Sequence, residues 1–388
     1  MYDVAISGGG PAGAYCARRC AQAGLSTVLI ERHTPPWTKT CAGGVLPRAV
    51  SRLDFELPSN VVEKEIMGLR VVGEGFNEVL RFDRCLTYTV DRTNFDECLL
   101  KMAERAGAEI ITGSSVDRII ERDTIELETG STKISARCAI IAEGVGSRNA
   151  DRLLGPSPRG GKAMGVRSIV NAVNDPGDEI EVFLLDTPTK WIRKCPMLPL
   201  MGWMFPYRER ANFGVGGYGY SKDVLYKSLD KITFESLVKV DAPVASKAHP
   251  IPILPRKRLA TNKVMLIGDT AGMVSPLSGE GLSHGLASSI LAAEAAKRLV
   301  NGDPQATRRF ERAVKDTVIR DITAAALMSP VLHWLLGVVD TGAFFKVIKE
   351  ETQYFESWGQ LALGHETWQS LLIKTIPRFH RLFFRSLV

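Results

Sequence analysis

The segment that most constrains the fold of this chain is DVAISGGGPAGAYCARRCAQAGLSTVLIER, residues 3–32. It opens with a short apolar run, residues 3–7, of the kind that forms a buried strand. Three glycines spaced GxGxxG follow, then an alanine-rich helix that we expect to end at Gly24, then a second strand at residues 27–30. Glu31 comes directly after that strand. This order predicts a βαβ unit that binds a dinucleotide.

Each part of the unit has a physical reason. Gly8 allows the tight turn, Gly10 lets the backbone approach a pyrophosphate, and Gly13 lets the helix pack closely on the strand. The helix N-terminus offers free N–H groups and a partial positive charge to the phosphates. Glu31 can accept both hydroxyl hydrogens of an adenosine ribose, which a glycine-rich turn without a ligand would not explain. The expected cofactor contacts in this unit are Gly8, Gly10, Ala12, Gly13, Glu31 and Arg32.

Composition limits the partners, metal sites and cellular locations that we expect for this chain. The net charge is +6, and no dense Lys/Arg block alternates with aromatic residues, so we expect no nucleic-acid partner. The chain has 7 cysteines without a CxxC pair, so no metal site is expected and the thiols suggest a reducing compartment. The start, MYDVAISGGG, is interpreted as a strand and not as a signal peptide, which favours a cytoplasmic location.

A second cofactor element comes much later, in KVMLIGDTAGMVSPLSGEGLSHG, residues 263–285. A buried strand at 264–267 runs into a Gly-Asp pair, and a loop rich in glycine leads into a helix expected at about 282–300. This segment resembles the FAD-dependent flavoprotein group that includes aromatic hydroxylases and prenyl reductases. The resemblance implies that the cofactor is FAD and that Asp269 hydrogen-bonds its ribityl chain or pyrophosphate. It also implies that the helix N-terminus, at Gly281 and Leu282, faces the pyrimidine side of the flavin and favours the anionic reduced ring.

Two further segments are similar to the same group. TVDRTNFDECLLKMAERAGAEI, residues 89–110, implies that Arg92 lies beside the flavin chain, and Val116 falls where the group contacts adenine through the backbone. AIIAEGVGSRNA, residues 139–150, resembles the second FAD motif of the group. Glu143 stands there in place of the usual aspartate, which puts any specific role of this position in doubt.

The segment PPWTKTCAGGVL, residues 35–46, raises the question of a lone cysteine beside two glycines. Together with SGEGL it resembles geranylgeranyl reductases, enzymes that saturate isoprenoid double bonds in archaeal lipids, chlorophyll tails and quinone chains. The resemblance covers about residues 1–300 and implies that Cys41 lies at the flavin ring, with contacts from Cys41, Ala42, Gly43 and Gly44. Cys41 could donate a proton, could shape the pocket while a bound water is the acid, or could be an inert small side chain; a zinc or disulfide role is disfavoured.

Another signature of that family, Tyr-x-Trp-x-Phe-Pro, is partly present in MGWMFPYRERANFGVGG, residues 201–217. Trp203 and Phe205 match it, but Met201 replaces the tyrosine and Tyr207 replaces a frequent Lys or Arg. These departures put the substrate in doubt more than the reaction class. A strand that directs tryptophan and phenylalanine into a cavity suits an isoprenoid tail, although these aromatic side chains could also belong to the core.

The predicted fold class is α/β (α+β), with a Rossmann-like FAD-binding domain, an antiparallel-sheet substrate domain and a helical C-terminal region. The FAD-binding domain is expected at residues 1–50, 85–155 and 260–300, the substrate domain at 51–84 and 156–259, and the helical domain at 301–388. Residues 322–339 are uncharged, and we expect a buried helix that lines an apolar cavity in preference to a membrane span. The basic and aromatic tail, IPRFHRLFFRSLV, could lie on the inner face of a membrane or cap the domain.

These observations favour an FAD-dependent reductase of isoprenoid C=C bonds whose substrate is a lipid, pigment or quinone tail. The first alternative is an FAD-dependent monooxygenase or halogenase of the same fold that acts on a small aromatic compound. A flavin-containing binding protein without catalysis is the second. No second GxGxxG unit is present, so the electron donor could be NADPH, a ferredoxin as redox partner, or another small reductant.

Overall fold

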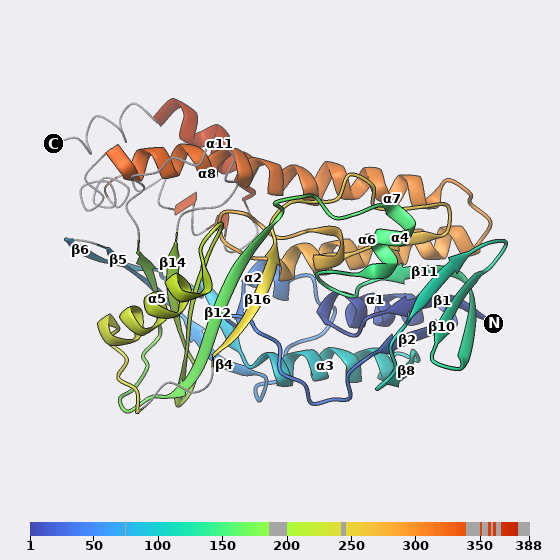
Figure 1. Ribbon diagram of the computed structural model, residues 1–388, viewed down its shortest axis with the longest axis horizontal. Helices are drawn as coiled ribbons and strands as arrows, with labels where there is room; N and C mark the ends of the chain where they lie inside the picture. Colours follow the sequence, from blue (N-terminus) through green and yellow to red (C-terminus); the bar gives the residue numbers. More distant parts are fainter. Residues whose placement is uncertain are drawn as a thin grey trace.

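The computed structural model describes residues 1–73, 75–185, 200–241, 246–338, 350, 356–357, 360–361 and 366–378. Two large sheets lie side by side along the long axis of the molecule, and a layer of helices covers one side (Figure 1). The first sheet holds the N-terminal βαβ unit, and the second holds strands from residues 68–81 and 162–252, within the ranges given above for the substrate domain. The predicted α/β architecture is therefore confirmed.

The first sheet has seven strands in the order β8-β2-β1-β11-β10-β9, with β17 paired to β11. Its strands are β1 (Tyr2–Ser7), β2 (Thr27–Glu31), β8 (Glu109–Thr112), β9 (Arg118–Glu121), β10 (Ile125–Thr129), β11 (Thr132–Ile141) and β17 (Val264–Leu266). The pairs β1–β2, β1–β11, β2–β8 and β11–β17 are parallel, whereas β9 and β10 run antiparallel to their neighbours. Because β17 joins this sheet, the segment at residues 263–285 meets the N-terminal βαβ unit at the same edge of the sheet.

Helix α1 (Pro11–Gln22) begins with a proline at its first turn, where no N–H is needed, and Gly24 with φ +81° follows its end. It packs against α6 (Leu282–Val300) and α3 (Arg92–Arg105), which lie on either side of it (Figure 1). Cys16 and Cys20 are fully buried on α1 and act as core fillers, as expected.

The second sheet also has seven strands, in the order β16-β12-β15-β14-β13-β5-β6. They are β5 (Gly68–Gly73), β6 (Phe76–Arg81), β12 (Lys162–Asn171), β13 (Glu179–Leu184), β14 (Met201–Pro206), β15 (Arg210–Gly217) and β16 (Lys247–Pro252). All neighbouring pairs are antiparallel except β13–β5, which is parallel. Helix α5 (Lys222–Glu235) packs on β12, β14 and β15.

A small sheet of β3 (Gly44–Val45), β4 (Val62–Ile66) and β7 (Thr87–Val90) has the order β3-β7-β4. Two short helices complete the N-terminal 155 residues, α2 (Pro47–Val50) and α4 (Arg148–Leu154). Residues 51–84 therefore contribute strands to two sheets, and the division of the chain into domains at the boundaries given above stays a prediction.

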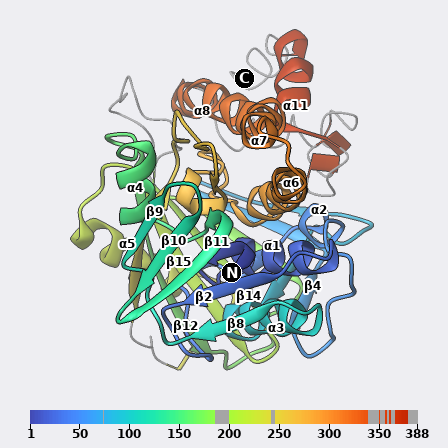
Figure 2. The same ribbon diagram turned by 90° about the vertical axis from the view of Figure 1, so that its right-hand side faces the viewer.

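The chain beyond residue 300 is helical where the structure describes it. Helix α7 (Ala306–Val314), a π-helical turn (Lys315–Ile319) and α8 (Arg320–Val338) follow one another, and α11 (Trp368–Thr375) packs on α8 and ends in a 3₁₀ turn (Ile376–Arg378). Figure 2 shows these helices stacked above the first sheet. Within the described ranges, no helix combines the length and the hydropathy that a membrane crossing would need. Most of the basic aromatic tail, residues 379–388, lies outside the described residues.

Candidate active site

A cavity of about 1400 Å³ lies between the two large sheets. A typical small-molecule pocket has roughly 300–1,000 Å³, so this cavity has room for a dinucleotide and a second ligand. The structure brings most of the predicted site residues to its wall: Gly8, Gly10, Ala12, Glu31, Arg32, Cys41, Ala42, Gly44, Arg92, Val116, Trp203, Phe205, Asp269, Gly281 and Leu282. Gly13 and Gly43 are not among the lining residues, and both serve packing instead.

The glycines at the start of α1 differ in what surrounds them. A Cβ at Gly13 would lie 1.9 Å from the Gly8 carbonyl oxygen, so this glycine allows the close approach of helix and turn. A Cβ at Gly10 would meet no atom within 4 Å, because Gly10 borders the open cavity. The first turn of α1 has no side-chain cap and no acidic residue, so its N–H groups remain available to a phosphate.

Glu31 lies buried at the end of β2, with its carboxylate fixed in place. Its Oε2 accepts from the Gly9 N–H at 2.6 Å, and its Oε1 accepts from the His33 N–H at 2.9 Å. Each carboxylate oxygen has a further lone pair for a ribose hydroxyl. Glu143, the residue that replaces the usual aspartate, has a structural role, since it accepts bonds from Ser7, Ser147 and Asn149.

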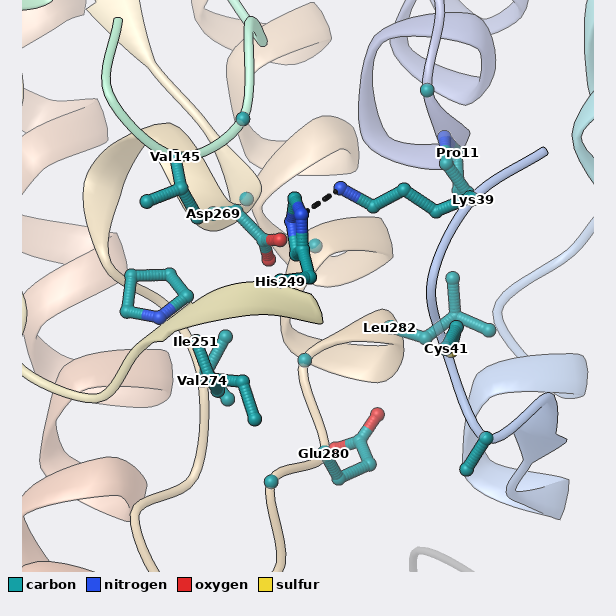
Figure 3. Close-up of a pocket in the computed structure, with 18 of the residues that line it drawn as sticks. Pro11, Lys39, Cys41, Val145, His249, Ile251, Asp269, Val274, Glu280 and Leu282 are labelled. Carbon is teal, nitrogen blue, oxygen red and sulfur yellow. Dashed lines mark hydrogen bonds between the residues drawn. The ribbon is translucent and has the colours of Figure 1, made fainter. Parts of the chain in front are cut away.

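The Gly-Asp pair and α6 form the next part of the wall, as Figure 3 shows for Asp269 and Leu282. A carboxylate that the motif did not point to lies at the N-terminus of α6. Oε1 of Glu280 accepts both the N–H and the hydroxyl of Ser283, at 2.6 Å each, and so caps the first turn. This carboxylate cancels part of the positive end of the helix dipole.

Glu280 belongs to a buried cluster that the sequence did not reveal. Its Oε2 accepts from Arg48 Nη2 at 2.8 Å, and Arg48 Nη1 lies 3.8 Å from Asp321 of α8. His284 lies between the two carboxylates, with Nε2 at 3.3 Å from Asp321 and Nδ1 at 3.7 Å from Glu280. Burial alone would raise the pKa of Glu280, but Arg48, His284 and Ser283 outweigh it and lower that pKa to about 2.

Cys41 lies on the wall between the cofactor-binding residues and the second sheet. Its Sγ accepts from the Gly43 N–H at 3.4 Å, and its carbonyl accepts from Asn212 Nδ2 at 2.8 Å. Burial disfavours the charge on nearby Arg92, but Asp96 and then Cys41 outweigh burial and raise the pKa of Arg92. The thiol therefore borders the cavity beside the largely buried guanidinium of Arg92.

The two glycines after Cys41 explain the CAGG pattern. Gly43 has φ +83°, and a Cβ there would lie 2.3 Å from the Tyr207 hydroxyl. A Cβ at Gly44 would lie 2.7 Å from Cε1 of Phe205. Residues 41–44 and the segment around FPY thus pack directly on each other, which joins two motifs that are far apart in the sequence.

Trp203 and Phe205 are partly buried on β14, and both line the cavity. Trp203 pairs with Gly214 of β15, and its indole covers that glycine. Aliphatic side chains from neighbouring strands continue the same face: Leu69, Val71, Leu80, Ile180, Val182 and Leu184. This part of the wall is suited to a long apolar ligand.

Lys39 and His249 also line the cavity, and the sequence analysis assigned no role to either. Nζ of Lys39 lies 2.9 Å from Nε2 of His249, although 210 residues separate them (Figure 3). Lys39 stands two residues before Cys41, which is a signal that could have been used. The position of His249 on β16 carries no such signal.

These residues fit FAD. A capless helix start beside Gly10, a fixed carboxylate at the end of β2 and an aspartate at the turn after β17 line one cavity, and these are the groups that a dinucleotide requires. When it is bound there, Glu31 would hold the ribose, the start of α1 the pyrophosphate, and Asp269 the chain between the pyrophosphate and the ring.

Comparison with known proteins agrees. Residues 1–306 match the model of the FAD binding domain family. A geranylgeranyl diphosphate reductase of Rhodobacter capsulatus is 28% identical over 334 residues, which cover 80% of this chain and 79% of that protein. The crystal structure of a geranylgeranyl bacteriochlorophyll reductase-like protein from Thermoplasma acidophilum superposes with a TM-score of 0.76 at 19% identity, covering 98% and 97% of the two chains. A flavin-dependent brominase has a similar fold, with a TM-score of 0.74, 18% identity and coverage of 98% and 99%.

The family match spans most of the chain and falls on the residues that form the cofactor end of the cavity. The chain therefore belongs to the FAD binding domain family and is an FAD-dependent oxidoreductase.

Proposed function

We propose that this protein reduces C=C bonds in geranylgeranyl or related isoprenoid chains. The observation that carries this proposal is the continuity of the cavity, which runs from the residues that fit FAD to the apolar face around Trp203. Burial of each CH₂ of a prenyl tail contributes about 0.8 kcal/mol. The R. capsulatus relative, named for a geranylgeranyl substrate, supports the same class.

When bound, reduced FAD supplies the hydride for this reaction. The task of the protein is positioning, because an isolated alkene has no carbonyl group that could stabilise developing charge. Trp203 and Phe205 hold the chain against the segment 41–44, and the buried wall excludes water. The Cys41 thiol, or a water held near it, delivers a proton to the second carbon.

The direct test is anaerobic reoxidation of the reduced protein. We expect that a geranylgeranylated diphosphate, lipid, quinone or pigment reoxidises the flavin, and that mass spectrometry finds the product heavier by two hydrogens per reduced bond. If none of these compounds reoxidises the flavin, the proposal fails. Extraction of the purified protein with organic solvent would identify a retained lipid and narrow the substrate class.

The similarity of the fold to a flavin-dependent brominase keeps one alternative under test, a halogenase or monooxygenase for small aromatic compounds. Such an enzyme would show fast reaction of the reduced flavin with O₂ and NAD(P)H oxidation that rises with an aromatic substrate. The long aliphatic wall formed by β5, β6 and β13 favours the reductase.

The electron donor is proposed to be NADPH or a ferredoxin. Stopped-flow reduction of the bound flavin by NADPH distinguishes them, because a ferredoxin-dependent enzyme would be reduced only when the reduced ferredoxin is added.

We also propose that helix α11 contacts a membrane surface while the protein works on a lipid chain. Ile373 and Ile376 are 60% and 67% exposed, whereas Leu372 and Thr375 of the same segment line the cavity. An isoprenoid chain could therefore pass from a bilayer into the cavity beside this helix. Sedimentation with vesicles that contain anionic lipid should show binding that the double variant I373S/I376S loses, and equal sedimentation of the two proteins would exclude this contact.

A further inference from the structure

The cavity face of the second sheet changes its chemistry along the strand order. The strands at one end, β6, β5 and β13, contribute aliphatic side chains, whereas β12 and β16 contribute Arg167 and His249. In Figure 1, β12 and β16 lie next to the first sheet, and β5 and β6 lie at the opposite end of the molecule. The cationic end of this face is therefore the end nearest to the cofactor-binding residues.

Arg167 is a buried guanidinium without a carboxylate partner among the residues that the structure describes. It is 8% exposed, its Nη2 donates to the Lys39 carbonyl at 2.8 Å, and its Nε is buried without any hydrogen-bond partner. Other buried arginines in this protein are paired, as Arg70 is with Glu181 and Arg256 with Asp151. A buried cation without a counter-charge is costly, so this arrangement points to a negative group that a bound molecule brings.

Lys39 adds a second positive charge at the same place. Its hydrogen bond goes to His249, and burial and then Lys39 itself lower the pKa of His249 to about 4. The imidazole is therefore neutral at pH 7 and accepts from the ammonium group without cancelling its charge. Asp269 faces the other side of His249 (Figure 3). Nearby Arg92 is already held by Asp96 at 2.7 Å.

The position of the two cations decides which negative group they meet. Arg167 joins β12 to the segment that leads into Cys41, and it stands two residues after Gly165, where a Cβ would lie 3.7 Å from the Trp203 indole. Lys39 contacts His249, which faces Asp269. The aliphatic part of the wall extends away from Lys39 and Arg167. Only the reacting part of a prenyl tail bound along that wall would therefore lie near the two cations. The start of α6 is another source of positive charge at the cavity, but its contribution is weakened because Glu280 caps that helix.

We propose that Lys39 and Arg167 form a cationic pair that stabilises the negative charge that FAD gains on reduction, and so raise its reduction potential. Uptake of two electrons and one proton from the donor leaves the flavin with one negative charge. A nearby cation stabilises that form more than the neutral oxidised form. The proposal rests on FAD binding and not on the prenyl substrate, so its failure would leave the proposed reaction standing.

The test measures the potential of the bound flavin in the purified holoprotein by equilibration with reference dyes. The variants are R167Q, K39M and the charge-preserving R167K, and K162Q is the matched control. Lys162 is on the same strand as Arg167, but it is exposed and does not line this cavity. Sulfite binding is a second readout, because sulfite adds to oxidised flavin and gives an anionic adduct.

We expect the sulfite dissociation constant to rise about tenfold in R167Q and in K39M. The reduction potential of the flavin should fall by about 30 mV, which corresponds to a tenfold change for a two-electron couple. R167K and K162Q should remain close to the unmodified protein. Unchanged potential and sulfite affinity in both R167Q and K39M would overturn the proposal. If R167Q fails to hold FAD, K39M decides the question with the same measurements.

A different source of negative charge, the diphosphate of a substrate, gives a distinct outcome. Titration of the oxidised holoprotein with inorganic diphosphate would then perturb the flavin spectrum, and R167Q would lose that perturbation while it keeps the potential. This pattern would also overturn the proposal, because the pair would serve a substrate headgroup and not the flavin.

Discussion

The indole of Trp203 covers Gly214 on the neighbouring strand so closely that a Cβ at Gly214 would lie 2.1 Å from its Cζ2. The glycine is therefore what allows the tryptophan to lie against the sheet while its edge lines the cavity. This relationship connects a segment of β14 that resembles a family signature with the glycine-rich strand β15.

Replacement of Gly214 by alanine should displace the indole and reduce turnover of a prenyl substrate about tenfold or more, because overpacking costs roughly 1–3 kcal/mol. The content of bound flavin should stay unchanged, since Gly214 does not border the cofactor end. Gly216→Ala is the matched control on the same strand, where the nearest atom, Cζ3 of Trp203, is 3.4 Å away. Equal kcat/KM values for the two variants would contradict this reading.

The contact between Gly44 and Phe205 predicts a rescue. Gly44→Ala should lower kcat/KM, because its new methyl group would lie 2.7 Å from the Phe205 ring. The double variant G44A/F205L should recover part of the loss, since the smaller side chain leaves room for the methyl group. A double-mutant cycle on kcat/KM and on the free energy of unfolding measures the coupling, and strictly additive effects would show that the two residues act independently.

The role of Cys41 can be read from the kinetics of the chemical step. If the thiol is the acid, Cys41→Ala should slow reoxidation of the reduced flavin by a prenyl substrate by roughly 10²–10⁴-fold. Reduction of the flavin by dithionite should be unaffected. Cys41→Ser keeps the size of the side chain and separates proton donation from packing. A loss below threefold in both variants would assign the proton to a bound water.

The Arg48–Glu280 pair predicts a dependence of stability on pH. The pKa of Glu280 is about 2 in the folded protein, below its ordinary value of 4.5. A depressed carboxyl pKa stabilises the fold above pH 4.5, and this contribution is lost as the pH falls from 4.5 towards 2. The free energies of unfolding of the parent protein and of E280Q, measured with urea over that pH range, should therefore become equal at low pH.

The same pair should be sensitive to removal of the cation. Arg48→Met leaves the Glu280 and Asp321 carboxylates buried without their shared guanidinium, and loss of one partner of a buried pair costs roughly 3–5 kcal/mol. The double variant R48M/E280Q should be less destabilised than R48M alone in the same unfolding experiment. If R48M unfolds at the same urea concentration as the parent protein, the pair is not a determinant of stability.

Local sequence determined the cofactor half of this protein. The strand, the glycines, the helix with its first-turn proline and the acidic residue at Glu31 lie within about thirty residues, so short-range geometry predicts them together. Helix α6 was predicted at the bounds that the structure shows, and the second sheet is largely antiparallel, as expected for the substrate domain. The resemblance to flavoproteins then supplied the roles of Asp269 and Cys41.

Only the tertiary structure decided which distant residues share the cavity wall. Lys39 meets His249, Arg48 meets Glu280 and Asp321, and Gly44 meets Phe205, in each case across more than 100 residues. The charge state and the packing of these groups depend on burial and on partners that the crossover between the two sheets brings together. A pattern of neighbouring residues contains no information about such partners, which is why the sequence predicted the FAD motifs but neither the buried charge cluster nor the cationic pair.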